Sequence, residues 1–561
     1  MLVLLAQLVA PPLQNSPVRL PSPAIEQPRR GSTKPQAPIL EAPIEAAPAG
    51  QPQLPQEPKD AIDSQKLLPI KGELPYTSQQ LAEILRSCSS LSPEEEKLRA
   101  CAAALTSRLV IDGYLNSRVY VFKEPPPAHL LVVKGKIVEL RIQGDDAQLN
   151  AKVRRWLQPI VGNTLHLASL ERTLQRLQRR PDISSVRSQL SRLGSDPSQA
   201  ALVVKVQAAP PSWQGDLSLR NDGSSGSGQA RATASILRPS LLKRGDSILF
   251  YGELDGSESP ALGQASGSLS YTYPLGENIN LTGAFGSSRQ NSIELPPPGN
   301  GFSTTQLQGL GQLEWVLNET LSQRWSLALA YSGSTSTSRL NNQPLPDFMP
   351  QRIREPKNGY LRLELNGSGS DSALYWSGQV YGLQGIAAAT PADQLQELTS
   401  ADIFPGRSSA IGTFLSLGWG FLPSWQLTLR GGGQLALRKL TEPMRFSLGA
   451  DVGLRGLPGQ LISGDNGWVG SAELAWTAWQ RRGQLVQLVP FIGSGGVSTE
   501  FGDQIFADSV GSGGILVRWL AGENWSTEIG WVRQFSTQNN AGAWNDWLLG
   551  KGLYTKINYR F

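Results

Sequence analysis

The sequence predicts a transmembrane antiparallel β-barrel of about 16 strands, preceded by two small α/β domains. Three observations support this fold. Of the 15 tryptophans, 14 lie from Trp213 onward, where apolar and polar residues alternate along the chain. Before this region, helical and strand periodicities follow each other in an order that occurs twice. The first residues are rich in proline and lack either periodicity.

The composition limits the class of protein. Only 17% of the 561 residues are charged, the net charge is +5, and no basic block is present, so nucleic acid is not an expected partner. Two cysteines exclude a disulfide-rich scaffold, and two histidines leave little for a zinc site. The sequence contains no run of 18 apolar residues, which excludes a membrane protein built on helices.

The N-terminal residues predict a targeting segment and a tether. Residues 1–10 (MLVLLAQLVA) form an apolar run that ends in small residues. This run resembles the core of a secretory signal, truncated because the usual positive charge before it is missing. Residues 11–66 contain 13 of the 40 prolines. Because such a chain buries too little apolar surface to offset its ordering entropy, we expect a disordered linker.

Residues 67–134 and 135–210 predict two domains with the same order of elements: one strand, two helices and two strands. Each sheet leaves an edge strand that an extended partner segment can join, although an ordinary structural module has the same edge. The expected helices contain Leu81–Cys88, Ser92–Leu109, Val153–Ile160 and Leu170–Leu177, and the expected strands are Lys66–Ile70, Arg118–Phe122, Leu130–Val133, Ile137–Ile142, Val186–Leu190 and Ala201–Val206.

The only two cysteines, Cys88 and Cys101, fall near the end of one predicted helix and within the next. In an oxidising compartment we expect a disulfide between them, and two buried thiols are the alternative. On the chain-entropy model such a bridge stabilises the fold by roughly 3 kcal/mol.

Residues 211–561 alternate as barrel strands do. For example, Trp325, Leu327 and Leu329 alternate with serine and alanine. The polar faces carry Ser, Thr, Asn, Gly and Arg, and aromatic residues gather at strand ends, as in a lipid-facing belt around a wet lumen. Since lipid forbids open strand edges, the sheet must close. The alternative is a soluble, lectin-like adhesin built of β-sandwiches, which would place its aliphatic residues inside.

Three motifs carry a resemblance to a known family. The chain from about residue 67 to 561 resembles the TpsB outer-membrane transporters of two-partner secretion, the haemolysin secretion/activation type, which belong to the outer-membrane barrel-assembly superfamily and carry two POTRA domains. The first motif is Asn221-Asp222-Gly223, Gly228-Gln229-Ala230-Arg231 and Arg244-Gly245-Asp246; the second is Leu454-Arg455-Gly456-Leu457 with Gly464, Asp465 and Glu473; the third is Phe491, Gly493 and Gly495. In addition, Tyr559 and Phe561 form a C-terminal signal typical of outer-membrane barrels.

The resemblance implies a loop that folds back into the lumen, where its arginine contacts an acidic residue of the inner wall. Here that arginine is Arg455, and a guanidinium in a narrow lumen suits a carboxylate. The family's acidic position corresponds to Gly493, so the sequence departs from the pattern. Either Arg455 pairs with another acid, of which Glu473 is the first candidate, or this latch is weaker.

The implied function is export of a large, TpsA-like exoprotein with an N-terminal secretion domain, which the POTRA domains would bind in the periplasm. Outer-membrane lipids, periplasmic chaperones and the barrel-assembly machinery are the other expected partners. No cofactor or enzyme activity is expected, because no nucleotide-binding motif occurs and His129 and His166 are isolated. A barrel-assembly insertase of the same superfamily and a passive porin remain alternatives.

Overall fold

The computed structural model describes most of the chain from residue 69 onward, and the chain divides into two compact units, of which one contains the described residues up to 209 and the other those from 212 to 561. The expected signal segment 1–10 lies outside the described residues, as does the linker 11–66 except for Leu40 and Glu41. The described residues are 40–41, 69–88, 92, 94–124, 126–178, 180, 182–209, 212–224, 226–257, 261–294, 301–320, 322–371, 373–501, 504–535 and 547–561.

The first α/β domain contains the predicted elements in the predicted order. A short strand β2 (Ile70–Lys71) precedes the helices α2 (Ser78–Leu85) and α3 (Glu94–Ile111), and β3 (Arg118–Phe122) and β4 (His129–Val133) complete the sheet β2-β4-β3. Thr77 caps α2, since its hydroxyl accepts a hydrogen bond from the Gln80 amide. The expected disulfide joins Cys88 to Cys101, and it lies in the apolar core between the two helices.

The second α/β domain repeats this order with β5 (Lys136–Gln143), α4 (Ala147–Leu157), α5 (Leu167–Gln178), β6 (Ile183–Arg192) and β7 (Gln199–Ala208). Its apolar core includes the fully buried Leu157 and Leu174. The sheet order is β1-β6-β7-β5, in which β1 (Leu40–Glu41) pairs in parallel with the outer edge of β6.

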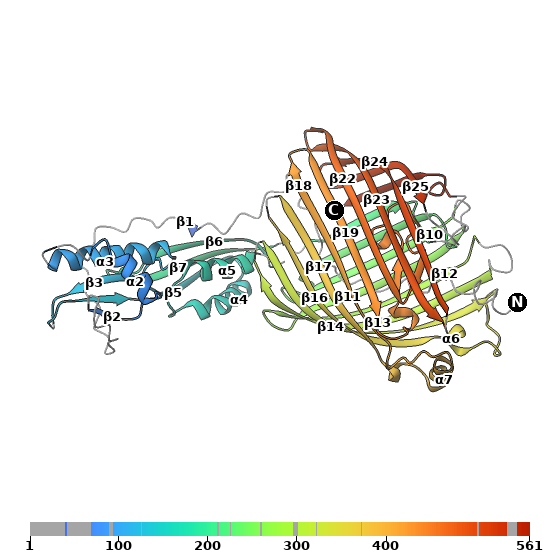
Figure 1. The fold of residues 1–561 in the computed structure, drawn as a ribbon, viewed down its shortest axis with the longest axis horizontal. Coiled ribbons are helices and arrows are strands. Elements are labelled where there is room, and N and C mark those ends of the chain that lie inside the picture. The colour runs from blue at the N-terminus through green and yellow to red at the C-terminus, as the bar shows by residue number, and fades with distance from the viewer. Residues whose placement is uncertain are drawn as a thin grey trace. The chain divides into compact units, whose positions relative to one another are not determined.

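A closed antiparallel barrel follows, which confirms the predicted fold class (Figure 1). Neighbouring strands pair in sequence order, and the last strand closes the sheet on the first. Within the described chain the wall consists of 16 strands: β8 (Gln214–Arg220), β9 (Ala230–Pro239), β10 (Ser247–Gly256), β11 (Leu262–Pro274), β12 (Ile279–Asn291), β13 (Phe302–Glu319), β14 (Gln323–Leu340), β16 (Lys357–Ser370), β17 (Leu374–Gly385), β18 (Ser409–Leu422), β19 (Trp425–Ala436), β22 (Asn466–Arg481), β23 (Gln484–Phe501), β24 (Gln504–Ala521), β25 (Trp525–Phe535) and β26 (Leu553–Arg560).

The barrel wall is apolar outside and polar inside. Outward-facing side chains such as Phe285, Leu363 and Ile529 are exposed, whereas inward-facing Thr282, Gln308 and Glu528 are buried. None of the helices in the described ranges is both long and apolar enough to cross a bilayer.

Several strands are longer than the expected ten residues. The strands β13, β14, β23 and β24 each span 18 residues. The sequence predicts surface loops at Ser287–Thr304 and Thr335–Lys357, because these segments are polar or rich in Gly and Pro. These two predictions are partly wrong, since β12–β14 extend into both segments. The pairing of β13 with β14 continues to Phe302 and Leu340. Serine and threonine side chains there alternate between the two faces of the sheet, but neither face is apolar.

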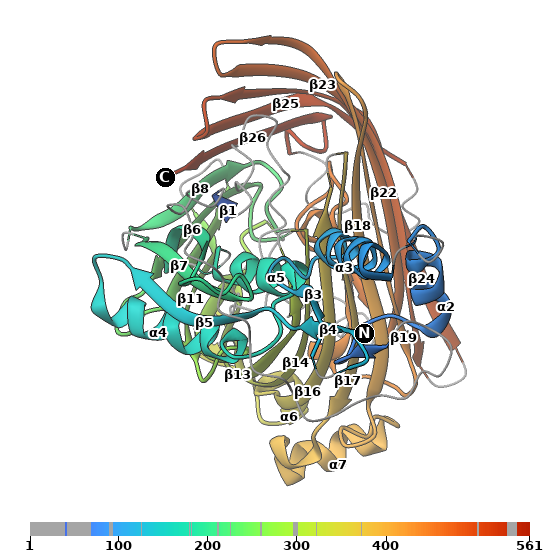
Figure 2. The same cartoon turned by 90° about the vertical axis from the view of Figure 1, so that its left-hand side faces the viewer.

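The connections at the two ends of the barrel differ in length. Turns such as 319–323 and 481–484 are short, whereas the connections at the opposite end include 341–356, 386–408 and 437–465. Two of the long connections carry the helices α6 (Gln351–Arg354) and α7 (Ala392–Ser400), which lie side by side in both views (Figures 1 and 2). The side chain of Glu397 joins them, since it accepts hydrogen bonds from the amides of Gln351 and Arg352.

Candidate functional site

The candidate site is the connection between β19 and β22, residues 437–465, which we call the lumen loop. It includes a two-stranded hairpin of β20 (Phe446–Leu448) and β21 (Ile462–Gly464), and it holds the tip Gly449–Gly459 against inward-facing residues of the wall. The tip contains the expected arginine motif Leu454-Arg455-Gly456-Leu457.

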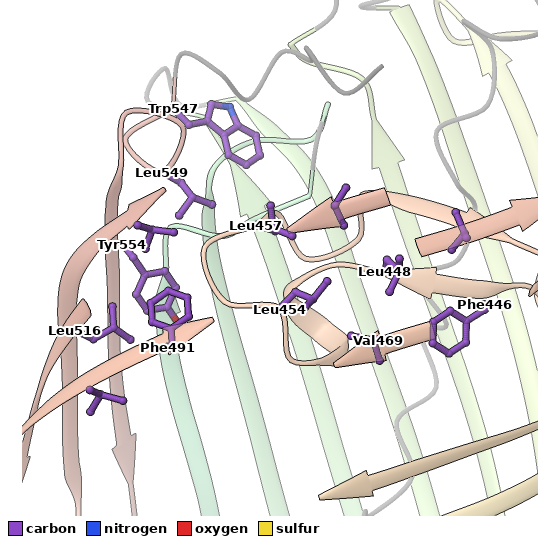
Figure 3. Packing of buried hydrophobic residues seen from close by; sticks show 14 of the residues in the cluster. Phe446, Leu448, Leu454, Leu457, Val469, Phe491, Leu516, Trp547, Leu549 and Tyr554 are labelled. Atoms are coloured by element: carbon purple, nitrogen blue, oxygen red, sulfur yellow. The ribbon is translucent and has the colours of Figure 1, made fainter. Parts of the chain in front are cut away.

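Apolar contacts hold the tip against the wall. Leu454 and Leu457 are fully buried. They belong to one cluster with wall residues such as Phe491, Leu516 and Tyr554 (Figure 3). A buried leucine contributes about 2 kcal/mol by leaving water, so these two residues favour the inserted position of the loop.

Gly456 fits a position that no other residue fills without strain. Its φ of +78° lies in the left-handed region, and a Cβ atom there would meet Cγ1 of Val532 at 2.0 Å. The carbonyl oxygen of Gly456 also accepts a hydrogen bond of 2.9 Å from the Gln534 side chain. The backbone of the tip therefore lies directly on β25.

Arg455 forms two ion pairs with the inner wall. Its Nε donates to Oε1 of Glu473 on β22 at 2.7 Å, and its Nη1 donates to Oε2 of Glu528 on β25 at 2.5 Å. Both glutamate side chains are only 5% exposed. One guanidinium thus binds two nearly buried carboxylates, which its planar set of donors allows.

The two glutamates also have arginine partners on the wall itself. Arg430 of β19 donates to Glu473 at 2.5 Å. Arg518 of β24 donates to Glu528 at 2.7 Å and lies 3.5 Å from Glu473. We call Arg430, Glu473, Arg518 and Glu528 the wall charge cluster. Within it, each carboxylate has at least one partner that does not belong to the loop.

A second ion pair holds the tip at another part of the wall, with its charges reversed. Asp451 of the loop accepts a hydrogen bond of 2.9 Å from Nη1 of Arg231 on β9, whose side chain is fully buried. Arg231 also binds Asp255 on β10 at 3.2 Å and the Ser224 hydroxyl at 2.7 Å. Gly459 lies beneath the guanidinium, where a Cβ atom would meet Nη2 at 2.3 Å.

The ion pairs of Arg455 and those of Asp451, which we call the two anchors of the tip, flank the pairing of β26 with β8 that closes the barrel. The strands β26 and β8 pair over a short stretch, Lys556–Arg560 with Asp216–Arg220. The side chain of Asn221 extends this pairing, since it accepts from the amide of Thr555 at 2.8 Å and donates to the carbonyl of Leu553 at 2.7 Å. One anchor lies on β9, beyond β8, and the other on β22 and β25, so the tip spans the junction.

Comparison with known families and structures now identifies the chain. Residues 198–512, more than half of the 561, match the model of the haemolysin secretion/activation protein family ShlB/FhaC/HecB. The chain belongs to this family. No curated protein matches the sequence significantly.

Solved structures share the fold of this ShlB/FhaC/HecB-family protein at low sequence identity. CdiB from Escherichia coli is 16% identical, with 88% of this chain and 89% of that chain covered at a TM-score of 0.66. CdiB from Acinetobacter baumannii is 15% identical (92% and 94% covered, TM-score 0.62). BamA from Haemophilus ducreyi lacking POTRA domains 1–3 is 15% identical (86% and 98% covered, TM-score 0.52). These structures therefore share the fold of this chain, a closed β-barrel preceded by small α/β domains that resemble POTRA domains.

Gly493 departs from the family's acidic motif for a visible reason. A Cβ atom at this position would meet Cδ2 of Leu454 at 2.9 Å and Cβ of Ser471 at 3.1 Å. Leu454 thus occupies the space that an acidic side chain would need. The expected alternative partner, Glu473, does bind Arg455, and Glu528 is a second partner that the sequence analysis missed.

The other predicted residues of this family member lie in structural positions. Asp465 pairs with Arg445 of the same loop at 3.0 Å, and a Cβ atom on Gly464 would meet the Ser498 carbonyl at 2.8 Å. A Cβ atom on Gly495 would meet Leu448 at 2.9 Å. Tyr559 contacts the Trp525 ring, and Phe561 exchanges two backbone hydrogen bonds with Gly215 at the closure of the barrel.

A cavity of about 250 Å³ remains beside the tip of the loop. Polar residues of the wall line it, including Arg324, Asn366 and Gln379, and Val452 of the loop forms one side. It is smaller than the pockets that usually hold small-molecule ligands. Among the described residues, no group of three or more His, Cys, Asp or Glu side chains is arranged to hold a metal ion.

Proposed function

We propose that this protein exports a large exoprotein across the outer membrane of a Gram-negative bacterium by two-partner secretion. The observation that carries the proposal is the lumen loop, tied to the barrel wall at Arg455 and at Asp451. In this proposal the exoprotein arrives unfolded, binds the POTRA domains in the periplasm and passes through the lumen. Periplasmic chaperones and the barrel-assembly machinery would act when the barrel itself is made.

Transport requires the loop to leave its place. The tip Gly449–Gly459 packs against inward-facing residues of the wall and is bound at Arg231, Glu473 and Glu528, so a polypeptide that passes here must displace it. A passive porin would need no ion-paired loop across its lumen. The loop contacts therefore favour a gated transporter over a porin.

The charges around the loop support reversible release. When Arg455 leaves, Glu473 retains Arg430, and Glu528 retains Arg518. When Asp451 leaves, Arg231 retains Asp255. Because removing one member of a buried pair is costly mainly when the other charge is left without a partner, this arrangement lowers the cost of opening.

We propose that the edge of β6 in the second POTRA domain binds the exoprotein as an added strand. Leu40 and Glu41 already pair in parallel with Ser188 and Gln189 at this edge. The edge is thus able to accept an extended segment by backbone hydrogen bonds.

The test is to remove residues 67–209 and to measure both export and conductance. The exoprotein would be the product of the neighbouring gene, quantified in the culture medium, and conductance would be recorded in planar bilayers. We expect loss of export from a barrel that still shows heat-modifiable migration on a gel. Full export without the POTRA domains would contradict the proposal.

The alternatives give different results. A porin would show unchanged conductance and would have no exported client. An insertase would instead be recognised by defects in other outer-membrane proteins after the same deletion.

A further inference from the structure

The outer surface of the barrel carries a group of cationic side chains at the end with the long connections. Arg289 lies near the end of β12, Arg339 near the end of β14, and Lys357 at the start of β16. All three side chains are exposed. Their neighbours Ser288 and Ser338 are buried, so the alternation directs Arg289 and Arg339 away from the lumen.

The register brings these residues together. Arg289 is paired with Thr305 of β13, Thr305 is paired with Thr337 of β14, and Arg339 follows Thr337 by two residues. Lys357 is paired with Thr335 of β14. With strands about 4.8 Å apart and a rise of about 3.3 Å per residue, the three cations lie within about 15 Å of one another along the wall.

An apolar belt lies directly below this group. Phe285, Leu307, Tyr331 and Leu361 are exposed on the same four strands, a few residues closer to the short turns. The group is therefore at the level where the hydrocarbon of a bilayer gives way to lipid headgroups. Since long connections face the exterior in such barrels, the leaflet is the outer one.

Nearby carboxylates do not neutralise the group. Asp347 pairs with Arg354, and Glu294 accepts from the Trp547 indole. Glu355 is exposed close to Lys357 in sequence, yet within the described ranges no ion pair joins a carboxylate to any of the three cations. Residues 295–300 contain no acidic residue.

We propose that Arg289, Arg339 and Lys357 form a binding site for a lipid with closely spaced phosphates in the outer leaflet. Guanidinium and ammonium groups bind phosphate by charge-assisted hydrogen bonds. The side chains of Asn291 and Asn342 and those of Thr305, Thr335 and Thr337 add further polar partners. Arg289 already lies 3.4 Å from the Asn291 side chain and 3.5 Å from that of Asn342, which orients it along the wall. The acyl chains would pack on the belt below.

The experiment measures lipid binding by the full chain in phosphatidylcholine nanodiscs. Bisphosphorylated lipid A is titrated against the unmodified protein and a triple variant, Arg289→Gln, Arg339→Gln and Lys357→Gln, and bound lipid is counted by native mass spectrometry. We expect the triple variant to bind roughly 100-fold more weakly, because each cation near a charged lipid surface contributes independently. A variant with Arg289→Lys and Arg339→Lys should retain most of the affinity.

The matched control removes the same amount of charge elsewhere at this end of the barrel. Arg407, Arg533 and Lys551 are exposed, and none of them belongs to β12–β16 or to the connections between these strands, so their triple glutamine variant should bind within about twofold of the unmodified protein. Equal losses in both triple variants would overturn the proposal in favour of unspecific attraction. Equal binding of the dephosphorylated lipid, or displacement by millimolar inorganic phosphate, would also overturn it.

Discussion

The two anchors of the lumen loop use the same chemistry with opposite polarity. At Arg231 the buried cation belongs to the wall and the loop provides the acid, Asp451. At Arg455 the loop provides the cation and the wall provides two acids. Each anchor also contains an ion pair of the wall itself, between residues directly opposite each other on neighbouring strands. These pairs are Arg231 with Asp255 and Arg518 with Glu528.

The difference shows which anchor holds the loop more firmly. Arg455 makes two short ion pairs with carboxylates that are almost completely buried, so its removal costs the loop two contacts. Asp451 makes one short pair, and its partner is already bound by Asp255 and Ser224. We expect Arg455 to dominate and Asp451 to assist. The four predictions below test this order.

The largest effect is expected for Arg455→Gln. The variant loses both ion pairs of the loop, while Arg430 and Arg518 keep the wall acids paired. Each charge-assisted hydrogen bond contributes about 1.5 kcal/mol, so the loss of two should raise the population of the open state roughly 100-fold. Single-channel recording in planar bilayers measures this population directly.

Arg438→Gln is the control for this change. Arg438 belongs to the same loop, and its side chain is exposed outside the tip. Its removal should leave the open population unchanged. If both variants opened the pore equally, the ion pairs of Arg455 would not be the dominant anchor.

The next effect is expected for Gly493→Asp, which restores the family's acidic residue. Because a Cβ atom there would crowd Leu454, the new side chain should displace the tip rather than strengthen it, at a cost of about 2 kcal/mol. Protease cleavage of the loop in detergent micelles should become faster. Adding Leu454→Ala should reverse part of the effect. If Gly493→Asp alone made protease cleavage of the loop slower, the result would contradict the packing argument.

A smaller effect is expected for Asp451→Asn. The amide keeps the size of the side chain and removes one charge-assisted hydrogen bond, so the open population should rise about tenfold. Asp347→Asn serves as the control, since Asp347 is exposed and pairs with Arg354 within the connection 341–356, away from the lumen loop. A rise as large as that of Arg455→Gln would show that the two anchors are equal.

The smallest expected effect is an interaction energy, the difference between the change in opening free energy of the double variant Arg455→Gln, Asp451→Asn and the sum of the two single changes. If the tip leaves the wall as one body, both anchors break together, and the two free energies should add to within about 0.5 kcal/mol. The same bilayer recording gives the value. A double variant no more open than Arg455→Gln alone would mean that the tip detaches from Arg231 first.

The fold was predictable from the sequence because local patterns determine most of it. Alternation from Trp213 onward predicted a closed barrel of 16 strands, and helical spacing around Leu105 and Leu174 predicted the α/β domains. The ends of the long strands were missed, since residues such as Ser334–Ser338 carry no apolar face to mark them.

The candidate site was only partly predictable. Arg455 and Glu473 were predicted because both belong to a motif that matches the family, although Gly493 in the next motif does not match. Glu528 and Arg518 were missed, although both lie on the inward face of alternating strands. Asp451 was missed because a loop carboxylate has no periodicity, and only the three-dimensional fold brings it to Arg231.

The charge content of the tip has a consequence for the electrical behaviour of the pore. Gly449–Gly459 contains one acidic and one basic residue, Asp451 and Arg455, so the segment is neutral as a whole. A single charge that crosses the full membrane voltage gains about 2.3 kcal/mol per 100 mV, but a neutral segment gains almost nothing. Applied voltage should therefore have little effect on whether the tip lies against the wall or away from it.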